Sequence, residues 1–478
     1  MKNKHFYVLL LLSAPVFLQW TTTYKKPKFN VLLICVDDLR PELNCYGADY
    51  IASPNIDRLA ASAVQFQRHY VNAPSCGPSR YTLLTGRYGP EDNNALFFRA
   101  AQITKGLEKV HPSMPEWFKD QGYTTVSVGK VSHHPGGRGG ADWNDSTIIE
   151  MPNAWDRHLM PVAEWQHPRG AMHGLAHGEI RVKQGEMDVF QTKEGDDAIY
   201  PDGAITGEAL NQLRKLSKNK KKPFFLAVGL LKPHLPFGAP KSYFDRYDGL
   251  ALPEIPHPQK PEGKTTWHPS NEFMNYNRRG KDPNSDKIFA EEVRRHYAAC
   301  VSYADASVGK ILAELKKTGA DKHTIVVLWG DHGWHLGEHA VWGKHTLFEE
   351  SLHSPLIIRY PNMKQAGRKT GAMVETLDIF PTLCDLTGIP MPAFAQGVSV
   401  KPILENPSQP GHPVVGYYNN AASLRTEQYR FTLHKDGSAE LYDHASEAKE
   451  TRNIAAQNPD LVESLQQQLK TRYFDRKP

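Results

Sequence analysis

Two pairs of polar side chains follow continuous apolar segments and could bind a metal ion together. Asp37 and Asp38 come after the first such segment, and Asp331 and His332 after a later one. If both segments are strands of one parallel sheet, their carboxyl ends meet at the edge where such sheets bind ligands. Either pair alone could be a strand-end turn, but together they favour a metal site. Three carboxylates suit Ca²⁺ or Mg²⁺ better than zinc, while the softer His332 leaves Mn²⁺ or Zn²⁺ open.

A cysteine near the start of an expected helix is a second candidate for chemistry. Pro78 fits the first turn of a helix, so Cys76 would lie at the helix N-terminus, where the dipole favours an anion. For a single cysteine the simpler interpretation is a small buried hydrophobic residue. The surrounding residues read Cys76-Gly77-Pro78-Ser79-Arg80-Tyr81-Thr82-Leu83-Leu84-Thr85-Gly86-Arg87.

This twelve-residue string resembles the signature of the type I sulfatases, Cys-x-Pro-Ser-Arg followed by Leu-Thr-Gly-Arg. In that family the cysteine is oxidised to formylglycine (3-oxoalanine). The resemblance extends from residue 30 to about residue 443 and is strongest to the iduronate-2-sulfatase branch, where His stands at position 332 and most sulfatases have Asn. It rests on seven further segments, residues 36–41, 53–57, 129–133, 224–229, 232–234, 331–334 and 336–339.

The resemblance implies a role for each candidate residue. It places Asp37, Asp38, Asp331 and His332 on one calcium ion, with modified Cys76 as a further ligand. Five other residues fall on the family's sulfate-handling positions, namely Arg80, Lys130, His133, His234 and Lys344. The resemblance also implies a maturation partner, either a formylglycine-generating enzyme or an anaerobic sulfatase-maturating enzyme.

Hydrolysis of a sulfate ester needs a strong nucleophile and a cationic environment. An aldehyde made from Cys76 hydrates to a gem-diol, of which one hydroxyl can attack sulfur while the other later expels sulfate. We expect His133 to act as the base and His234 to protonate the leaving group, although these two roles could be exchanged. Lys130, Lys344 and Arg80 would balance charge.

Two other functions fit parts of this pattern. A phosphodiesterase or phosphonate monoester hydrolase could use the same modified cysteine. A catalytically inactive calcium-dependent carbohydrate-binding protein would require loss of Cys76 or of the cationic residues, and all of them are present.

Apolar segments alternate with helical patterns along most of the chain. Strands are expected at residues 31–36, 124–128, 224–229, 324–329 and 356–359, and helices at residues 54–66, 114–121 and 290–317. This alternation predicts an α/β fold with a mostly parallel sheet sandwiched by helices, and the resemblance implies an alkaline-phosphatase-like fold. We assign residues 27–402 to this catalytic domain. Residues 403–478 would form a C-terminal subdomain, with a hairpin at residues 430–434 and 439–442 and a helix beginning at Pro459.

Two long irregular segments, residues 139–202 and 253–287, are expected to form walls around the strand ends. A deep pocket there admits a chain end more readily than the middle of a polymer, so we expect exo-action on a sulfated oligosaccharide. His133, His134 and Trp143 would belong to the walls. Trp334 and His339 are expected to contact the terminal sugar, Trp334 by stacking, with packing beneath the loop as the alternative. The resemblance suggests a uronate-containing saccharide, either a glycosaminoglycan or an ulvan-type algal polysaccharide.

The amino-acid composition excludes several classes of protein. Of 478 residues, 40% are hydrophobic and 23% charged, which excludes a disordered chain. The net charge of +5, without a basic stripe beyond residues 218–222, indicates no nucleic-acid partner. Residues 1–22 are typical of a secretory signal peptide, with a retained anchor as the alternative, and no later segment predicts a stable membrane span. Five cysteines are too few for a disulfide framework, and together these features favour export to a bacterial periplasm.

Overall fold

The main domain is built on one large twisted sheet. The computed structural model describes Met1, residues 29–107 and residues 110–477. The sheet has eight strands, in the order β14 (Arg368–Glu375), β2 (Val64–Tyr70), β13 (Leu356–Arg359), β10 (Thr324–Gly330), β1 (Asn30–Val36), β8 (Phe224–Leu230), β3 (Thr124–Gly129) and β6 (Arg157–Leu159). Only β13 runs antiparallel to its neighbours, so the expected mostly parallel sheet is confirmed.

Strand β1, at the centre of the sheet, is an unbroken apolar segment from Val31 to Val36 because both of its faces are buried. Leu32, Ile34 and Val36 of β1 pack into the core on one face of the sheet, while Val31 and the other odd-numbered residues pack into the core on the opposite face. A parallel strand covered on both faces has no solvent side, so polar residues begin only where the strand ends.

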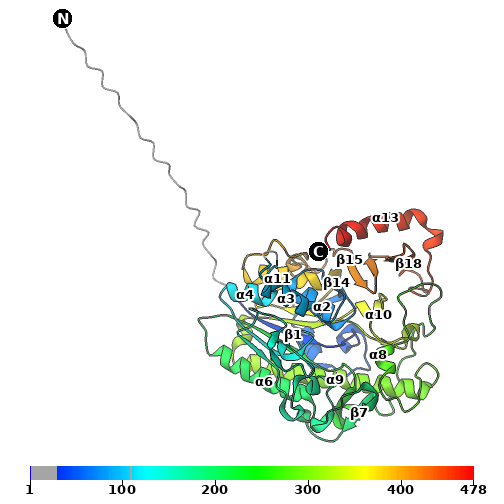
Figure 1. The fold of residues 1–478 in the computed structure, drawn as a ribbon, viewed down its shortest axis with the longest axis horizontal. Helices are drawn as coiled ribbons and strands as arrows, with labels where there is room; N and C mark the ends of the chain where they lie inside the picture. The colour runs from blue at the N-terminus through cyan, green and yellow to red at the C-terminus, as the bar shows by residue number, and fades with distance from the viewer. Residues whose placement is uncertain (2–28, 108–109, 478) are drawn as a thin grey trace.

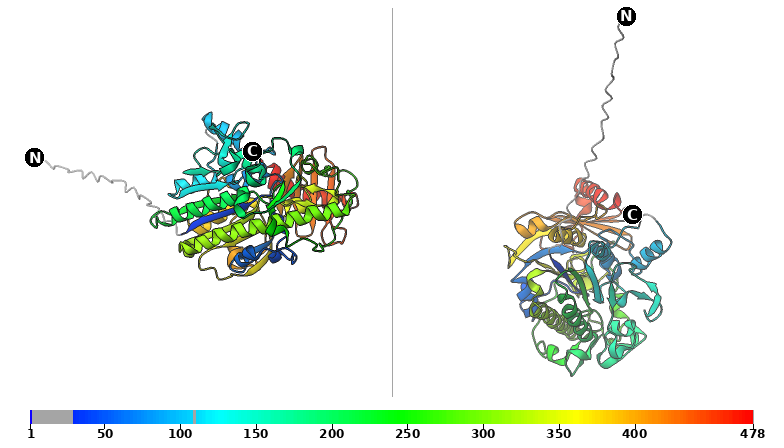
Figure 2. Two further views of the ribbon diagram at one scale, coloured as in Figure 1. Left: turned by 90° about the horizontal axis from the view of Figure 1, so that it is seen from below. Right: turned by 90° about the vertical axis from the view of Figure 1, so that its left-hand side faces the viewer.

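Helices cover both faces of the sheet (Figure 1). One layer contains α1 (Pro54–Ala60), α6 (Pro201–Ser217) and α9 (Lys287–Lys317). Figure 2 shows α6 and α9 side by side. The other layer contains α2 (Cys76–Thr85), α3 (Ala95–Thr104), α4 (Met114–Asp120), α11 (Ile379–Thr387) and α12 (Lys401–Glu405). In α9 the hydroxyl of Tyr297 donates to the carbonyl of Asp38 (2.8 Å), which fixes the chain just after β1.

A small antiparallel sheet lies at one end of the main domain (Figure 1, orange to red). It contains β15 (Val414–Tyr418), β16 (Ala421–Arg425), β17 (Tyr429–His434) and β18 (Ala439–Asp443), and α13 (Pro459–Leu469) packs on it. The expected hairpin and final helix are confirmed, whereas β15 and β16 were not predicted. The domain boundary at residue 402 remains a prediction.

The helix expected over residues 54–66 is wrong in its second half. Helix α1 ends at Ala60, and strand β2 begins at Val64. Val64 and Phe66 are fully buried and pair with β13 and β14, so tertiary pairing overrides the local helical spacing.

The two irregular segments carry only short elements. Together with the loops beside them, they contain β4 (Arg138–Gly139), β5 (Asp145–Ile149), α5 (Pro168–His173), β7 (Phe190–Lys193), β9 (Phe237–Pro240), α7 (Lys241–Phe244) and α8 (Asn271–Met274). Further along, β11 (His335–Leu336), β12 (Trp342–Gly343) and α10 (Glu349–Leu352) follow β10. Within the described ranges, no helix combines the length and apolar character needed to cross a membrane. The expected signal peptide, residues 1–22, lies outside the described residues except for Met1.

A buried ion-pair network joins the small sheet to the main domain. Arg430 of β17, only 1% exposed, donates to Glu349 Oε2 of α10 (2.5 Å) and also pairs with Glu450. The backbone N–H of Glu349 in turn donates to Glu450 (2.7 Å). The network therefore holds α10 against the C-terminal subdomain.

We predict that Arg430→Met lowers the free energy of unfolding by about 3 kcal/mol, because it removes the cation shared by the buried carboxylate of Glu450 and the partly buried carboxylate of Glu349. Arg68→Met is the matched control. Arg68 also reaches the C-terminal subdomain, but its partner Glu427 is 66% exposed, so we expect a loss of at most about 1 kcal/mol. Chemical denaturation of both variants checks this, and equal losses would contradict it.

Candidate active site

The two metal-binding pairs meet at the carboxyl edge of the large sheet. Strands β1 and β10 pair in parallel register up to Val36 and Gly330, so the residues that follow are neighbours. The backbone N–H of Asp331 donates to the Val36 carbonyl (3.2 Å), and that of Asp38 donates to Asp331 Oδ1 (2.9 Å). The predicted convergence of Asp37, Asp38, Asp331 and His332 is therefore present.

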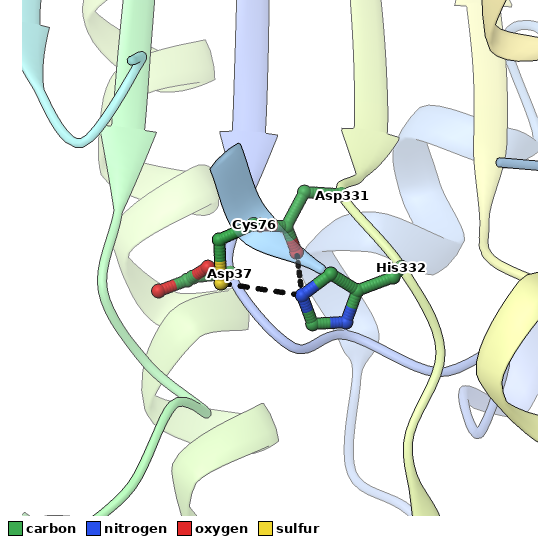
Figure 3. A group of neighbouring side chains, drawn as sticks. All are labelled: Asp37, Cys76, Asp331 and His332. Carbon is green, nitrogen blue, oxygen red and sulfur yellow. Dashed lines mark hydrogen bonds and ion pairs between the residues drawn. The ribbon is translucent and has the colours of Figure 1, made fainter. Parts of the chain in front are cut away.

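Cys76 lies at the N-terminus of α2 and faces this edge. Its Sγ is 3.3 Å from His332 Nε2 and 3.9 Å from Asp38 Oδ1, and the residue is only 2% exposed. Figure 3 shows Cys76 and Asp331 both directed at the His332 ring, with Asp37 beside them. The helix thus presents the cysteine to the acidic residues.

Arg80 is the central cation of the cluster. It lies one helical turn after Cys76 on α2, and its side chain is fully buried. Its Nη2 donates to Asp37 (3.0 Å) and to Asp331 (2.8 Å), while Nη1 donates to the carbonyls of Lys130 and Val131. A planar guanidinium can make these bonds simultaneously, and a lysine could not. Arg80 therefore orients the carboxylates from within the protein.

Two lysines complete the cationic side of the site. Lys344 Nζ lies 2.9 Å from Asp38 Oδ1 and 3.3 Å from Cys76 Sγ. Lys130, which follows β3, pairs with Asp37, and its Nζ is 3.8 Å from Cys76 Sγ. Both ammonium groups therefore border the space next to the cysteine.

His234 also reaches the cysteine. Its Nδ1 donates to the Leu235 carbonyl (2.6 Å), so Nε2 faces the site. Together with Asp37, Asp38 and Cys76 it forms a group whose potential ligand atoms lie within 4.8 Å of one another. Burial, reinforced by the charge of Lys130, lowers the pKa of His234 well below its ordinary value.

His133 lies at the edge of the cluster, against a wall formed by the segment after residue 130. Its ring centroid is 4.9 Å from that of His134 and 6.1 Å from that of Trp143. Its Nδ1 is buried and has no hydrogen-bond partner among the described residues. Burial, followed by the charge of Lys130, lowers the pKa of His133. His133, His134 and Trp143 therefore contact one another, and their role as a wall of the site stays a prediction.

For Trp334 and His339 the structure shows the packing alternative rather than an exposed position for sugar contact. Trp334 is fully buried, with its ring 5.3 Å from Lys344 Nζ, and cannot stack on a sugar in this position. His339 is 2% exposed and stacks on Phe348 with 4.4 Å between the ring centroids. Trp334 thus belongs to the hydrophobic core beneath the loop and lies against the ammonium group of Lys344, whereas His339 packs on Phe348.

Sequence reasoning missed Glu272, which lies on α8 in the second irregular segment. Its Oε1 is 3.3 Å from Lys344 Nζ and 3.6 Å from His234 Nε2. Burial alone would raise the pKa of Glu272, but attraction to Lys344 and His345 keeps it below the ordinary value. A lone glutamate in a segment without periodicity carries no signal that could have identified it.

The charges of the three aspartates favour an added cation. Burial raises the pKa of Asp38, although Lys344 opposes this. Burial and repulsion from Asp37 raise the pKa of Asp331 to about 7. In Asp37, by contrast, the charges of Lys130 and Arg80 outweigh burial and lower the pKa. A divalent cation would allow all three to ionise together.

The donor set fits such an ion. One oxygen each from Asp37 and Asp331, Sγ of Cys76 and a ring nitrogen of His332 lie within 4.8 Å of one another, and all four residues are buried. Asp38 lies next to His332 (3.3 Å) and supplies a third carboxylate. Carboxylate-rich sets are those that hard divalent cations prefer.

Comparison with known proteins identifies the family. Residues 29–389 match the sulfatase family, and residues 337–477 match the C-terminal region of N-sulphoglucosamine sulphohydrolase. A sulfatase of Formosa agariphila is 30% identical over 488 residues, covering 95% of this chain and 89% of that protein. Human iduronate 2-sulfatase is 33% identical over 405 residues, covering 76% of this chain and 70% of that protein. The chain therefore belongs to the sulfatase family and is a sulfuric ester hydrolase.

A solved structure supports the fold. A phosphonate monoester hydrolase from Silicibacter pomeroyi superposes with a TM-score of 0.75 over 94% of this chain and 96% of that one, at 22% sequence identity. Similarity at that level concerns architecture, and it agrees with the expected alkaline-phosphatase-like fold.

Proposed function

We propose that this enzyme removes sulfate from the end of a sulfated, uronate-containing saccharide of the glycosaminoglycan or ulvan type, using formylglycine made from Cys76. The observation that carries this proposal is the position of Cys76 at a helix N-terminus, between two lysine ammonium groups and buried carboxylates. The similarity to human iduronate 2-sulfatase, whose name specifies a uronate, supports a saccharide of this type.

Asp37, Asp38, Asp331 and His332, with modified Cys76, would hold one calcium ion. When bound, the ion supplies positive charge for the sulfate oxygens and for the hydroxyl that attacks. The aldehyde supplies a hydrate with two hydroxyls, so sulfate is released without water attacking sulfur.

The cationic side chains would bind the ester. Lys344 and Lys130 border Cys76 Sγ at 3.3 and 3.8 Å, close enough for their ammonium groups to contact sulfate oxygens. Arg80 already holds Asp37 and Asp331, so we assign it the orientation of these carboxylates. Positive groups fixed in a buried site stabilise the charge that develops during S–O cleavage without reorganising.

The two histidines would handle protons. His234 already uses Nδ1–H on a backbone carbonyl, so Nε2 is the atom that faces the ester, and Nε2 must gain a proton before it can protonate the leaving oxygen. His133 has an unpartnered, buried Nδ1 and a lowered pKa, which suits a neutral base. In this assignment His133 removes the proton from the second hydroxyl when sulfate is expelled.

The proposal also requires a partner and a compartment. A formylglycine-generating or anaerobic sulfatase-maturating enzyme would oxidise Cys76. The features of residues 1–22 support export, and we place the mature enzyme in a bacterial periplasm.

We predict that Cys76→Ala lowers kcat on an aryl sulfate at least about a thousandfold, because it deletes the nucleophile while removing few buried atoms. Cys384→Ala, which removes a buried thiol of α11, is the control and should stay within a fewfold of wild type. A Cys76→Ala variant that retained a tenth of wild-type activity would contradict the formylglycine mechanism. In the active enzyme, the tryptic peptide of residues 69–80 should have the lower mass of an aldehyde.

We further predict exo-action. Because Cys76 is nearly fully buried, only a chain end should bring its sulfate to the site. Released sulfate is measured with intact polymer and with lyase-cut oligosaccharides at equal sulfate concentration, and the oligosaccharides should react at least about tenfold faster. Comparable early rates would indicate an open cleft.

A further inference from the structure

A hollow of about 390 Å³ adjoins the catalytic centre between α8 and the turn that joins β15 to β16. This volume lies within the range of roughly 300–1,000 Å³ that is usual for small-molecule sites. Glu272 lines the hollow and also contacts Lys344 and His234. Lys344 Nζ lies 3.3 Å from Cys76 Sγ and 3.3 Å from Glu272, so Lys344 connects the catalytic centre to the hollow. A sugar whose sulfate is bound next to Cys76 would therefore extend past Glu272 into the hollow.

The hollow is acidic. Its lining includes two carboxylates, Glu91 and Glu272, and no lysine or arginine. Burial lowers the pKa of both lining histidines, His268 and His345, the latter to about 4, so both are neutral at pH 7. Glu272 already pairs with Lys344 (3.3 Å) and Glu91 with Lys477 (4.0 Å), so the carboxylate of a uronate ring placed here would have to compete with these carboxylates for their cations.

A second hollow next to the first is lined by lysines. That second hollow contains Lys264 and Lys435 and shares Asn419 and Asn420 with the first. Lys264 is already paired with Asp436. The charged residues that line the first hollow are therefore two glutamates, whereas those of the second are two lysines and Asp436.

The remaining lining suits a neutral or amino sugar. The amide side chains of Asn271, Asn419 and Asn420 offer donors and acceptors to hydroxyl groups. Tyr418 stacks on His345 with 5.3 Å between the ring centroids and 16° between the planes, which makes a flat wall. A sugar ring could lie against this wall while its hydroxyl or amino groups donate to Glu272.

We propose that this hollow binds the sulfate-bearing ring itself, that the ring is a hexose or hexosamine, and that Glu272 selects it by accepting hydrogen bonds from its hydroxyl or amino groups. This inference rests on the proposed function and refines its substrate. The uronate is then the sugar next to the sulfate-bearing ring.

The test compares three kinds of substrate with the mature, metal-loaded enzyme. An aryl sulfate serves as the sugar-free reference, and it is compared with a panel of monosulfated hexoses and hexosamines and a panel of monosulfated hexuronates. The best hexose or hexosamine should exceed the best hexuronate in kcat/KM by at least about tenfold. This is the discrimination expected when Glu272 accepts hydrogen bonds from one substrate and repels the carboxylate of the other.

Glu272→Gln should lower the ratio of sugar to aryl kcat/KM by about 10- to 100-fold, mainly through KM, because a charged acceptor is replaced by a neutral one. Glu262→Gln, an exposed position in the same segment, is the matched control and should leave the ratio unchanged.

Two results would overturn the inference. One is a wild-type preference for hexuronates. The other is an equal loss by Glu272→Gln on sugar and aryl substrates, which would mean that Glu272 only positions Lys344 and His234. In both cases release of sulfate from any of these substrates by the wild type would still uphold the sulfatase chemistry of the proposed function, whereas absence of sulfate release from all of them would refute the proposed function.

Discussion

Burial of three aspartates at one sheet edge is the constraint on which the rest of this structure depends. Desolvated carboxylates a few ångströms apart are unstable unless cations are fixed beside them. Here the register of β1 and β10 makes the aspartates neighbours, and Arg80, Lys130 and Lys344 arrive from three other segments. Fold and site therefore depend on one another.

The supporting elements can be understood from this requirement. Arg80 also bonds to two carbonyls after β3, so a single side chain aligns the cysteine helix, two strand ends and the Lys130 segment. Tyr297 of α9 fixes Asp38 from the opposite layer. Beyond Lys344, α10 is held by Arg430 of the small sheet, so the C-terminal subdomain helps to position the loop that carries Lys344.

Much of this could be predicted from the sequence where local pattern and function coincide. The apolar segments before Asp37 and Asp331 specify buried parallel strands, and the motif beginning at Cys76 specifies the helix and the family. The segment from Val64 was misassigned because its spacing also suits a helix, and only pairing with β13 and β14 decides the outcome. Trp334 follows the metal pair in sequence, yet sequence proximity does not reveal that its ring packs under Lys344. Glu272 reaches the site through the path of an irregular loop, which no pattern encodes.

The central claim is that the aspartate cluster holds a divalent cation that the chemistry requires. Calorimetric titration of chelator-treated protein with Ca²⁺ measures this most directly, with elemental analysis and sulfatase rates on the same samples. We predict one Ca²⁺ per chain, loss of activity in the metal-free protein, and better recovery with Ca²⁺ than with Zn²⁺, because three of the four side-chain ligands other than Cys76 are carboxylates. Full sulfatase activity in protein shown by elemental analysis to be metal-free would contradict the account.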